Sequence, residues 1–292
     1  MLRIGLLALP ACVAASLSAV AEPPAPRLAL YTLVESRKSV SAGGERASAV
    51  RGTVTVSGGA ARWDLTTGTF PRSTAKAFLV GERSAYLLDR DAPVAARVTM
   101  DDLRALFVPP SDGEAGPFQA VVRDLSVDAA EPAAGQPFQG RATRRHRLEA
   151  KWSLVTSSPG RVGRIRTRLS ATLDVVEEAP DEARSPLDDT ARLLDVPAAA
   201  FEALGPHLDA IRGWPVRVVV TTEAELSSES VGGAAGPSEE RAPVTVRSEA
   251  RREVSDLVVR AAAPGETSAL ALGEETRLVG IERLVEPRET LR

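Results

Sequence analysis

Short runs of alternating apolar and polar residues, separated by glycine-rich turns, make up the first third of the chain after its N-terminal leader. An alternation with a period of two places every second side chain on the same face of a β-strand. Because the intervening turns are short, we expect these strands to pair as an antiparallel meander. The strands are predicted over residues 28–34, 50–56, 61–65, 77–80 and 84–89.

The most regular alternation lies in the middle of the chain, on both sides of a turn at residues 157–160. Leu148, Ala150 and Trp152 alternate with charged residues before this turn, and residues 164–175 repeat the pattern after it. One face of the hairpin is therefore expected to pack on a core. Further strands are predicted over residues 118–127, 216–226, 244–250, 254–259 and 276–285.

Two segments show a helical pattern instead. Residues 99–107 begin with a threonine that can cap a helix, and their apolar residues fall on one helical face. The region 186–212 is divided by Pro197 and Pro206 into short helices, and residues 227–243 are expected to form a flexible loop. Together these patterns predict an α+β protein: a curved antiparallel sheet, an open half-barrel, with short helices packed on or capping its concave face.

The first 21 residues have the features of a secretory signal peptide. One arginine precedes an apolar stretch that ends in small residues at Ala19 and Ala21, and the stretch is too short for a comfortable membrane span. After a proline-rich spacer at residues 22–27, we expect one β-rich domain over residues 28–286. The mature chain is predicted to be periplasmic or secreted, without an integral membrane span.

A degenerate lipoprotein cleavage site ends at Cys12 and offers an alternative to this cleavage. Acylation there would anchor the protein to a membrane. Pro10 stands where a small residue is preferred, and the apolar stretch continues to the better site at Ala21. The sequence therefore favours cleavage after Ala21 over lipid attachment at Cys12.

Composition excludes several classes of protein. A net charge of −3 and an aromatic content of 4% give no support for binding nucleic acid. The histidines are His146 and His207, and the chain's one cysteine lies in the leader, so a metal site would depend mostly on carboxylates. No nucleotide-binding or nucleophile motif is present, and we expect neither a catalytic residue nor a cofactor. A hydrolase with an unrecognised site is an alternative, which requires one histidine to meet a serine and an acid.

A basic block spans residues 141–168, where nine lysines and arginines face Glu149 as the one acid. Strand alternation places most of these charges on one exposed face, which needs counter-charges. Phospholipid headgroups are one source, and the acidic residues of the segment 174–209 are the other; we favour the internal source. The candidate residues for contact with an anionic surface are Arg145, Arg147, Arg164, Arg166 and Arg168.

Three apolar residues are candidates for a hydrophobic binding site. Leu194 and Phe201 belong to the segment that is expected to be helical, and Trp214 joins this segment to the next strand. If the curved sheet is incompletely filled, these side chains would line an apolar cavity beneath the helices. If the interior is filled, they are ordinary core contacts between helix and sheet.

The overall organisation resembles that of uncharacterised bacterial periplasmic proteins related in architecture to the LolA/LolB lipoprotein carriers. The resemblance covers residues 28–259 and rests on strand order together with four stretches, Trp63-Asp64-Leu65, Ala85-Tyr86-Leu87-Leu88-Asp89, Gly140-Arg141-Ala142-Thr143-Arg144-Arg145-His146-Arg147-Leu148 and Arg212-Gly213-Trp214-Pro215-Val216-Arg217. It implies a strongly bent sheet closed by helices and the binding of acyl chains on the concave side. The expected function is a non-enzymatic envelope protein that binds a lipid or a lipidated protein. The alternative is an envelope interaction or scaffolding module with a filled core.

Overall fold

A computed structural model describes residues 26–68, 73–81, 84–89, 92–99, 119–158, 161–184, 190–194, 196–230 and 243–285. The predicted signal peptide, Cys12 and nearly all of the expected helix at residues 99–107 lie outside the described residues. The same is true of most of the expected loop at residues 227–243, although residues 227–230 belong to a strand.

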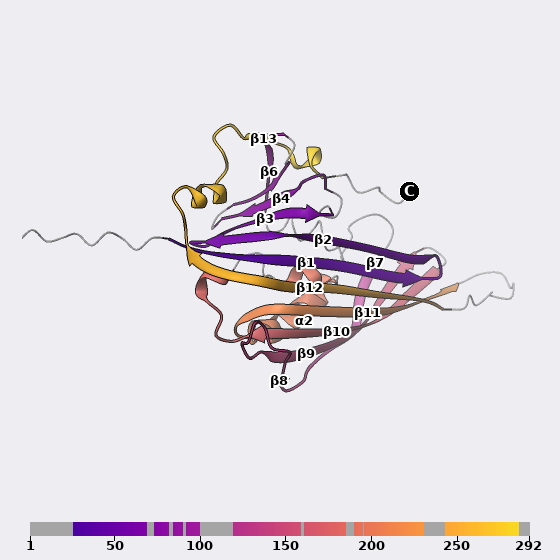
Figure 1. Cartoon of the computed structure of the whole chain (residues 1–292). Coiled ribbons are helices and arrows are strands. Elements are labelled where there is room, and N and C mark those ends of the chain that lie inside the picture. The colour runs from indigo at the N-terminus through magenta and orange to yellow at the C-terminus, as the bar shows by residue number, and fades with distance from the viewer. Residues whose placement is uncertain are drawn as a thin grey trace, which may run out of the picture.

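One sheet of 13 strands organises the described chain (Figure 1), in the order β13-β6-β5-β4-β3-β2-β1-β12-β11-β10-β9-β7, with β8 also paired to β9. Six long strands form its centre and one side: β1 (Arg27–Ser41), β2 (Gly44–Ser57), β9 (Arg144–Ser158), β10 (Arg161–Val176), β11 (Trp214–Ser230) and β12 (Val244–Ala261). The others are β3 (Ala60–Thr67), β4 (Ala77–Val80), β5 (Ala85–Leu88), β6 (Val94–Val98), β7 (Gln119–Ala129), β8 (Ala133–Ala134) and β13 (Arg277–Val279).

The observed architecture corrects the predicted open half-barrel with several capping helices. The sheet is large, mixed and not closed: β13 pairs with β6 in parallel, whereas the other strand pairs are antiparallel. The last expected strand, at residues 276–285, contributes only the three residues of β13 before a short 3₁₀ turn. Alternation in the sequence indicated most strands but carried no information on the parallel pairing of β13 with β6. The direction of pairing depends on how the chain connects the two strands.

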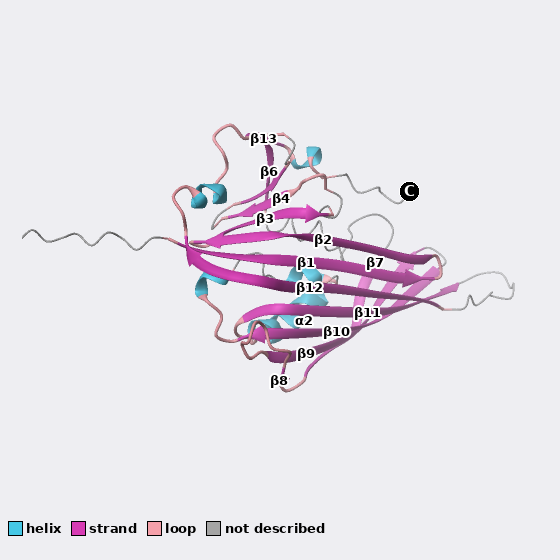
Figure 2. Cartoon of the chain, in the orientation of Figure 1, coloured by secondary structure: helices cyan, strands magenta, loops and turns pink. Residues whose placement is uncertain are grey.

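Helical structure is sparse in the described part of the chain (Figure 2), where one α-helix, α2 (Ala198–Asp209), lies against the sheet. Pro197 caps its start with a non-helical backbone, as expected for proline. Pro206 does not divide the segment, because α2 continues through it. The other helical turns among the described residues are the 3₁₀ segments η1 (Asp181–Ala183), η3 (Thr190–Leu193), η4 (Glu266–Leu270) and η5 (Ile281–Arg283).

Two apolar clusters lie on the inner face of the sheet. The first joins β1–β6 with Trp214 and Val216, at the start of β11. The second joins β9–β11 with η3 and α2, around Leu169, Leu194 and Leu204. The predicted alternation of the long hairpin is confirmed here, since Leu148, Ala150 and Trp152 are buried. Each cluster removes apolar area from water and so stabilises its own part of the sheet.

The long strands continue past both clusters. We call this part the distal sheet and define it as residues 38–41, 44–49, 221–230 and 244–249 of β1, β2, β11 and β12. All six residues 44–49 are exposed, as are Thr221 and Glu223. In Figure 1 these strand ends extend beyond α2 and beyond β3–β6. The distal sheet therefore offers both of its faces for contact.

None of the helices described here combines the length and the apolar character that crossing a membrane requires.

Candidate functional site

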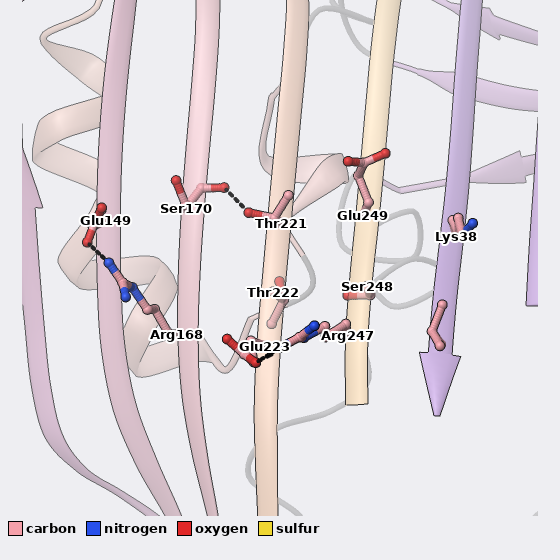
Figure 3. Close-up of a pocket in the computed structure, with 11 residues that line it drawn as sticks. Lys38, Glu149, Arg168, Ser170, Thr221, Thr222, Glu223, Arg247, Ser248 and Glu249 are labelled. Carbon is pink, nitrogen blue, oxygen red and sulfur yellow. Dashed lines mark hydrogen bonds and ion pairs between the residues drawn. The ribbon is translucent and has the colours of Figure 1, made fainter. Parts of the chain in front are cut away.

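The largest hollow described on the surface lies on the outer face of the sheet, opposite the apolar clusters. It has a volume of about 570 Å³ and crosses β9, β10, β11, β12 and β1 (Figure 3). Period-two alternation directs nine of the eleven lining side chains to this face, whereas Thr222 and Ser248 alternate with them and direct their side chains to the inner face. The residues that line it are Lys38, Val40, Glu149, Arg168, Ser170, Thr221, Thr222, Glu223, Arg247, Ser248 and Glu249.

Strand register arranges the charges of this hollow in two rows. One row crosses the strands through Glu149, Ser170, Thr221, Glu249 and Lys38 as successive partners. The next row, two residues further along each strand, crosses Lys151, Arg168, Glu223, Arg247 and Val40. The first row carries two acids and one base, and the second carries three bases and one acid, so the surface carries both signs of charge within a small area.

Ion pairs hold most of these side chains. Arg168 Nη2 donates to Glu149 Oε2 at 3.0 Å, and Arg247 Nη2 donates to Glu223 Oε1 at 2.8 Å. All four side chains keep between 42% and 73% of their surface exposed. Such pairs in water contribute little to folding stability. They can therefore exchange partners with a second molecule at small cost.

Part of the basic block receives its counter-charges from the protein, and from more than one source. In the segment 174–209, Asp174 pairs with Arg145 at 2.7 Å and Glu177 pairs with Arg144 at 3.0 Å. Arg166 and Arg168 instead approach acids on adjacent strands, Glu225 at 4.0 Å and Glu149 at 3.0 Å. Cross-strand pairing thus supplied counter-charges that a search along the sequence did not consider.

Arg147 and Arg164, the other two candidates for contact with an anionic surface, are exposed on the outer face. The described residues place no ion pair on either side chain. Thr172 lies opposite Arg147, and Val155 and Ser227 lie opposite Arg164. Both arginines are therefore accessible to an anionic group, and their contact with an anionic surface stays a prediction.

Asp174 lies on the same outer face but in a different environment. Its side chain is 1% exposed and accepts hydrogen bonds from Arg145 Nε at 2.7 Å and from Arg217 Nη1 at 3.2 Å. The segment after β8 covers it so closely that a Cβ atom on Gly135 would lie 2.8 Å from Asp174 Oδ1. Burial alone would raise the pKa of Asp174, but its bonds to Arg145 and Arg217 outweigh burial and lower the pKa.

The three predicted ligand-binding residues do not share one cavity. Leu194 is 1% exposed in the second apolar cluster, and Phe201 of α2 is half-buried against the same cluster. Trp214 is 1% exposed in the first cluster, where its ring makes edge contacts with Tyr31 at 5.3 Å and Phe138 at 5.7 Å. None of the three lines the 570 Å³ hollow.

The two histidines lie apart from each other in the fold. His146 begins the inner face of β9 and is half-buried, and burial, with the charge of Arg144 as a smaller cause, lowers its pKa. His207 lies in the last turn of α2. Among the described residues, neither histidine hydrogen-bonds to a serine or an acid, which is the arrangement that the hydrolase alternative requires.

The sequence interpretation missed the outer-face residues of β11 and β12, above all Thr221, Glu223, Arg247 and Glu249. A signal for them was present, because the residues alternate with apolar or small ones in both segments. The alternation identified these segments as strands, and it also indicated which of their residues face away from the core, but these outward-facing residues were not considered as a site. Their convergence depends on strand order, which brings β12 between β1 and β11.

No model of a known protein family matches this chain, and a search of curated proteins finds no significant match either. These comparisons therefore give no evidence for or against the resemblance to the lipoprotein carriers.

Proposed function

We propose that this chain is a non-enzymatic protein of the cell envelope, exported by its predicted leader, that binds a protein partner through the outer hollow and the adjoining outer face of its distal sheet. The observation that carries the proposal is the continuation of the long strands past both apolar clusters. Strands in globular proteins average about five or six residues, whereas β11 and β12 have 17 and 18. Packing of the cores does not account for this extra length.

The chemistry of the hollow favours a polar partner of mixed charge. Lys38, Arg168 and Arg247 are interleaved with Glu149, Glu223 and Glu249, and Thr221 adds a hydroxyl group. A uniformly anionic surface such as a phospholipid layer would be repelled by the three glutamates as much as it is attracted by the bases. A protein surface with both charges can match such rows, and complementary charges of this kind set specificity and orientation.

A hydrophobic ligand, the other function predicted for an envelope protein, has less geometric support. It would enter near Leu194, Phe201 or Trp214, but the first and last of these are fully packed in separate clusters. Binding there would require a rearrangement that opens a core. The proposal therefore adopts the interaction module with a filled core rather than the carrier.

A charge exchange across one ion pair tests the proposed surface. The double variant Glu149→Arg with Arg168→Glu keeps an ion pair between β9 and β10 but reverses the charges that a partner meets. We expect unchanged thermal stability and at least a tenfold loss of the partner in co-purification from the host envelope. Retention of the partner at wild-type levels would contradict the proposal.

Two residues of β11 provide the matched control. A photo-crosslinking amino acid at Thr221 faces the outer hollow, whereas the same amino acid at Ala224 begins on the inner face and away from the residues that line the hollow. We expect one defined cross-linked partner from position 221, lost in the charge-exchanged variant, and none from position 224. Equal cross-linking from both positions would indicate nonspecific contact.

Native mass spectrometry with lipid extraction tests the carrier alternative directly. The mature protein, purified gently from its own host, is expected to have the mass of the chain alone. An acyl-chain species bound at defined stoichiometry would overturn the filled-core interpretation.

A further inference from the structure

One edge of β7 is unpaired in the described part of the sheet. β7 ends the sheet and pairs with β9 along its other edge. A strand at the end of a sheet presents a row of backbone N–H and C=O groups that can pair with a further strand. Proteins often keep such edge strands short, but β7 has 11 residues, and Val121 within it is 47% exposed. Its length and exposure suit pairing with another strand.

A bulge near the middle of β7 controls which of its side chains share a face. The register with β9 shifts after Arg123, and Asp124 at the shift has a left-handed backbone with a φ of 54°. Arg123 lies opposite Ser153 of β9. Asp128 lies opposite Glu149, four positions earlier in β9. The extra residue in β7 therefore places Arg123 and Asp128 on the same, outer face of the sheet.

The charges of Arg123 and Asp128 are available to a second molecule. Both side chains are exposed, and the described residues place no ion pair on either of them. Asp128 lies opposite Glu149, and two acids that face each other across a strand pair repel. Arg168, 3.0 Å from Glu149, compensates one of these two acids. A base delivered to the open edge of β7 would compensate the other.

The sequence of β7 is complementary to itself in one antiparallel register. In this register a twofold axis passes through Ser126, which lies opposite its own copy. Leu125 then lies opposite the partner's Val127, and in each copy these two side chains lie against the second apolar cluster. Each bulge leaves one residue of its own strand unpaired, so the faces of the two strands match on both sides of the axis.

The same register matches the free charges. Beyond the bulges, Arg123 lies opposite the partner's Asp128, and symmetry repeats this pair on the other side of the axis. Opposite charges that face each other across an antiparallel pair of strands stabilise it. Each arginine also compensates the repulsion between Asp128 and Glu149 in the other copy. Backbone pairing, apolar contact and charge therefore favour a single register.

We infer that two copies of this chain associate through β7, so that their sheets join into one continuous sheet across a twofold axis. Backbone hydrogen bonds between the two β7 strands hold the copies together, and the two pairs of Arg123 with the partner's Asp128 fix the register. None of the residues that line the outer hollow belongs to β7. The contact therefore leaves that hollow free and does not depend on the partner proposed for it.

The size of the contact predicts a weak dimer. One strand paired with its copy buries less than about 1,200 Å² in total, which is the range of transient complexes. We expect a dissociation constant on the order of 50 μM. Most of the protein is then a single chain in dilute samples, such as those used for native mass spectrometry.

Analytical ultracentrifugation of the protein without its leader tests the dimer. Sedimentation equilibrium from about tenfold below to about tenfold above the expected dissociation constant should show single chains in equilibrium with dimers. A protein that sediments as a single chain throughout this range would overturn the inference. So would association beyond the dimer, which is expected if β7 paired instead with β13 at the other end of the sheet.

Charge reversal on β7 tests the register. Arg123→Asp and Asp128→Arg each place like charges opposite each other twice, so each is expected to weaken the dimer at least about tenfold. An equimolar mixture of these two variants restores both opposite-charge pairs between unlike copies, and the double variant restores them with itself. We expect both samples to form dimers within about threefold of the wild-type affinity. Two single variants that do not associate when mixed would overturn the register.

Arg164→Asp is the matched control for net charge. It makes the same change of charge as Arg123→Asp, on an exposed residue of β10 that does not belong to the edge strand. We expect it to change the dissociation constant by less than about twofold. Thermal unfolding of each variant confirms that it is folded. An equal loss in Arg164→Asp would reduce the effect to net charge and overturn the role of Arg123.

Cysteine cross-linking locates the twofold axis. The chain's one cysteine lies in the predicted leader, so the protein without it has no thiol of its own. Ser126→Cys places two thiols opposite each other, with Cβ atoms about 5 Å apart, and is expected to form a disulfide-linked dimer under mild oxidation. Val121→Cys, at another exposed position of β7, separates the two thiols by about 30 Å and is the control. Cross-linking from Val121→Cys that equals or exceeds that from Ser126→Cys would contradict the position of the axis.

Discussion

The covered and distal parts of the same strands differ in what holds them. Along β11, Val218 and Val220 are buried against the second apolar cluster, whereas Leu226 is 37% exposed in the distal sheet. Backbone pairing continues without interruption from one part to the other. The difference shows that hydrogen bonding sets the length of this sheet, while apolar burial sets how much of it is stabilised by the core.

Charge pairs on the outer face repeat the contrast. Asp174 is covered by the segment after β8 and its partner Arg145 is 30% exposed, whereas Glu149 and Arg168 are open to water. Both pairs join β9 to β10. A buried carboxylate cannot lose its partner without a large cost, whereas an exposed one can. Pairs of the same chemistry thus stabilise the fold in one place and leave a surface open to binding in the other.

The largest expected effect is loss of the buried carboxylate. Asp174→Asn should lower the free energy of unfolding by about 4 kcal/mol, because it removes the buried negative charge and one of the two oxygens that accept from Arg145 and Arg217. Glu149→Gln, the exposed counterpart, should change it by less than about 0.5 kcal/mol. Urea denaturation measures both. Similar losses in the two variants would remove the proposed distinction between the pairs.

The next largest effect concerns apolar burial. Leu204→Ala, in the part of α2 that faces the second cluster, should cost about 3 kcal/mol, through lost burial and the cavity that remains. Leu226→Ala in the distal sheet should cost less than about 0.5 kcal/mol. Denaturation midpoints compare the two. A large loss in the distal variant would mean that the distal sheet is covered in the free protein.

Acid should remove part of the stabilisation that Asp174 provides. Its pKa is lower in the folded protein than the value of about 3.9 in an unfolded chain. The contribution is therefore fully present above about pH 5 and is lost as pH falls through the folded value. The stability difference between wild type and Asp174→Asn should shrink below about pH 4. A constant difference down to pH 2 would contradict this assignment.

The smallest effect is local opening of the distal strands. Amide hydrogen exchange at Ala224 should be at least about tenfold faster than at Val218, because no apolar cluster holds the distal end of β11. Addition of the envelope partner should slow exchange in the distal sheet and leave Val218 unchanged. Equal protection of the two amides in the free protein would argue that the distal sheet is as stable as the core.

Sequence alternation predicted the strands and their faces well, because side-chain direction in a strand depends only on local geometry. The hairpin of β9 and β10 and the burial of Leu169, Leu173 and Val175 were foreseen in this way. The features that were not foreseen include the length of β12 as one strand, the short strands β6 and β8, and the parallel pairing of β13. The first and the last of these depend on a partner strand that is distant in the sequence.

The candidate surfaces were foreseen only in part. The basic residues of β9 and β10 drew attention because they are contiguous in the sequence, and their outward direction followed from the pattern. Glu223 and Arg247 lie on later strands, and the sequence does not state that β10, β11, β12 and β1 are neighbours. A smaller hollow on the inner face, which Arg37 and Val220 help to line, was missed for the same reason, since these residues meet only through strand order.

The position of β1 also has a consequence for how the chain folds. This early strand lies inside the sheet, between β2 and β12, and its pair Glu35 and Arg252 is 217 residues apart in the sequence. Contacts over such separations form slowly, because a long loop must close before they contribute. The N-terminal meander therefore keeps one edge of β1 open until the last long strand has been synthesised. We therefore expect the sheet to form late and cooperatively, with the pairing of β1 and β12 as the step that completes it.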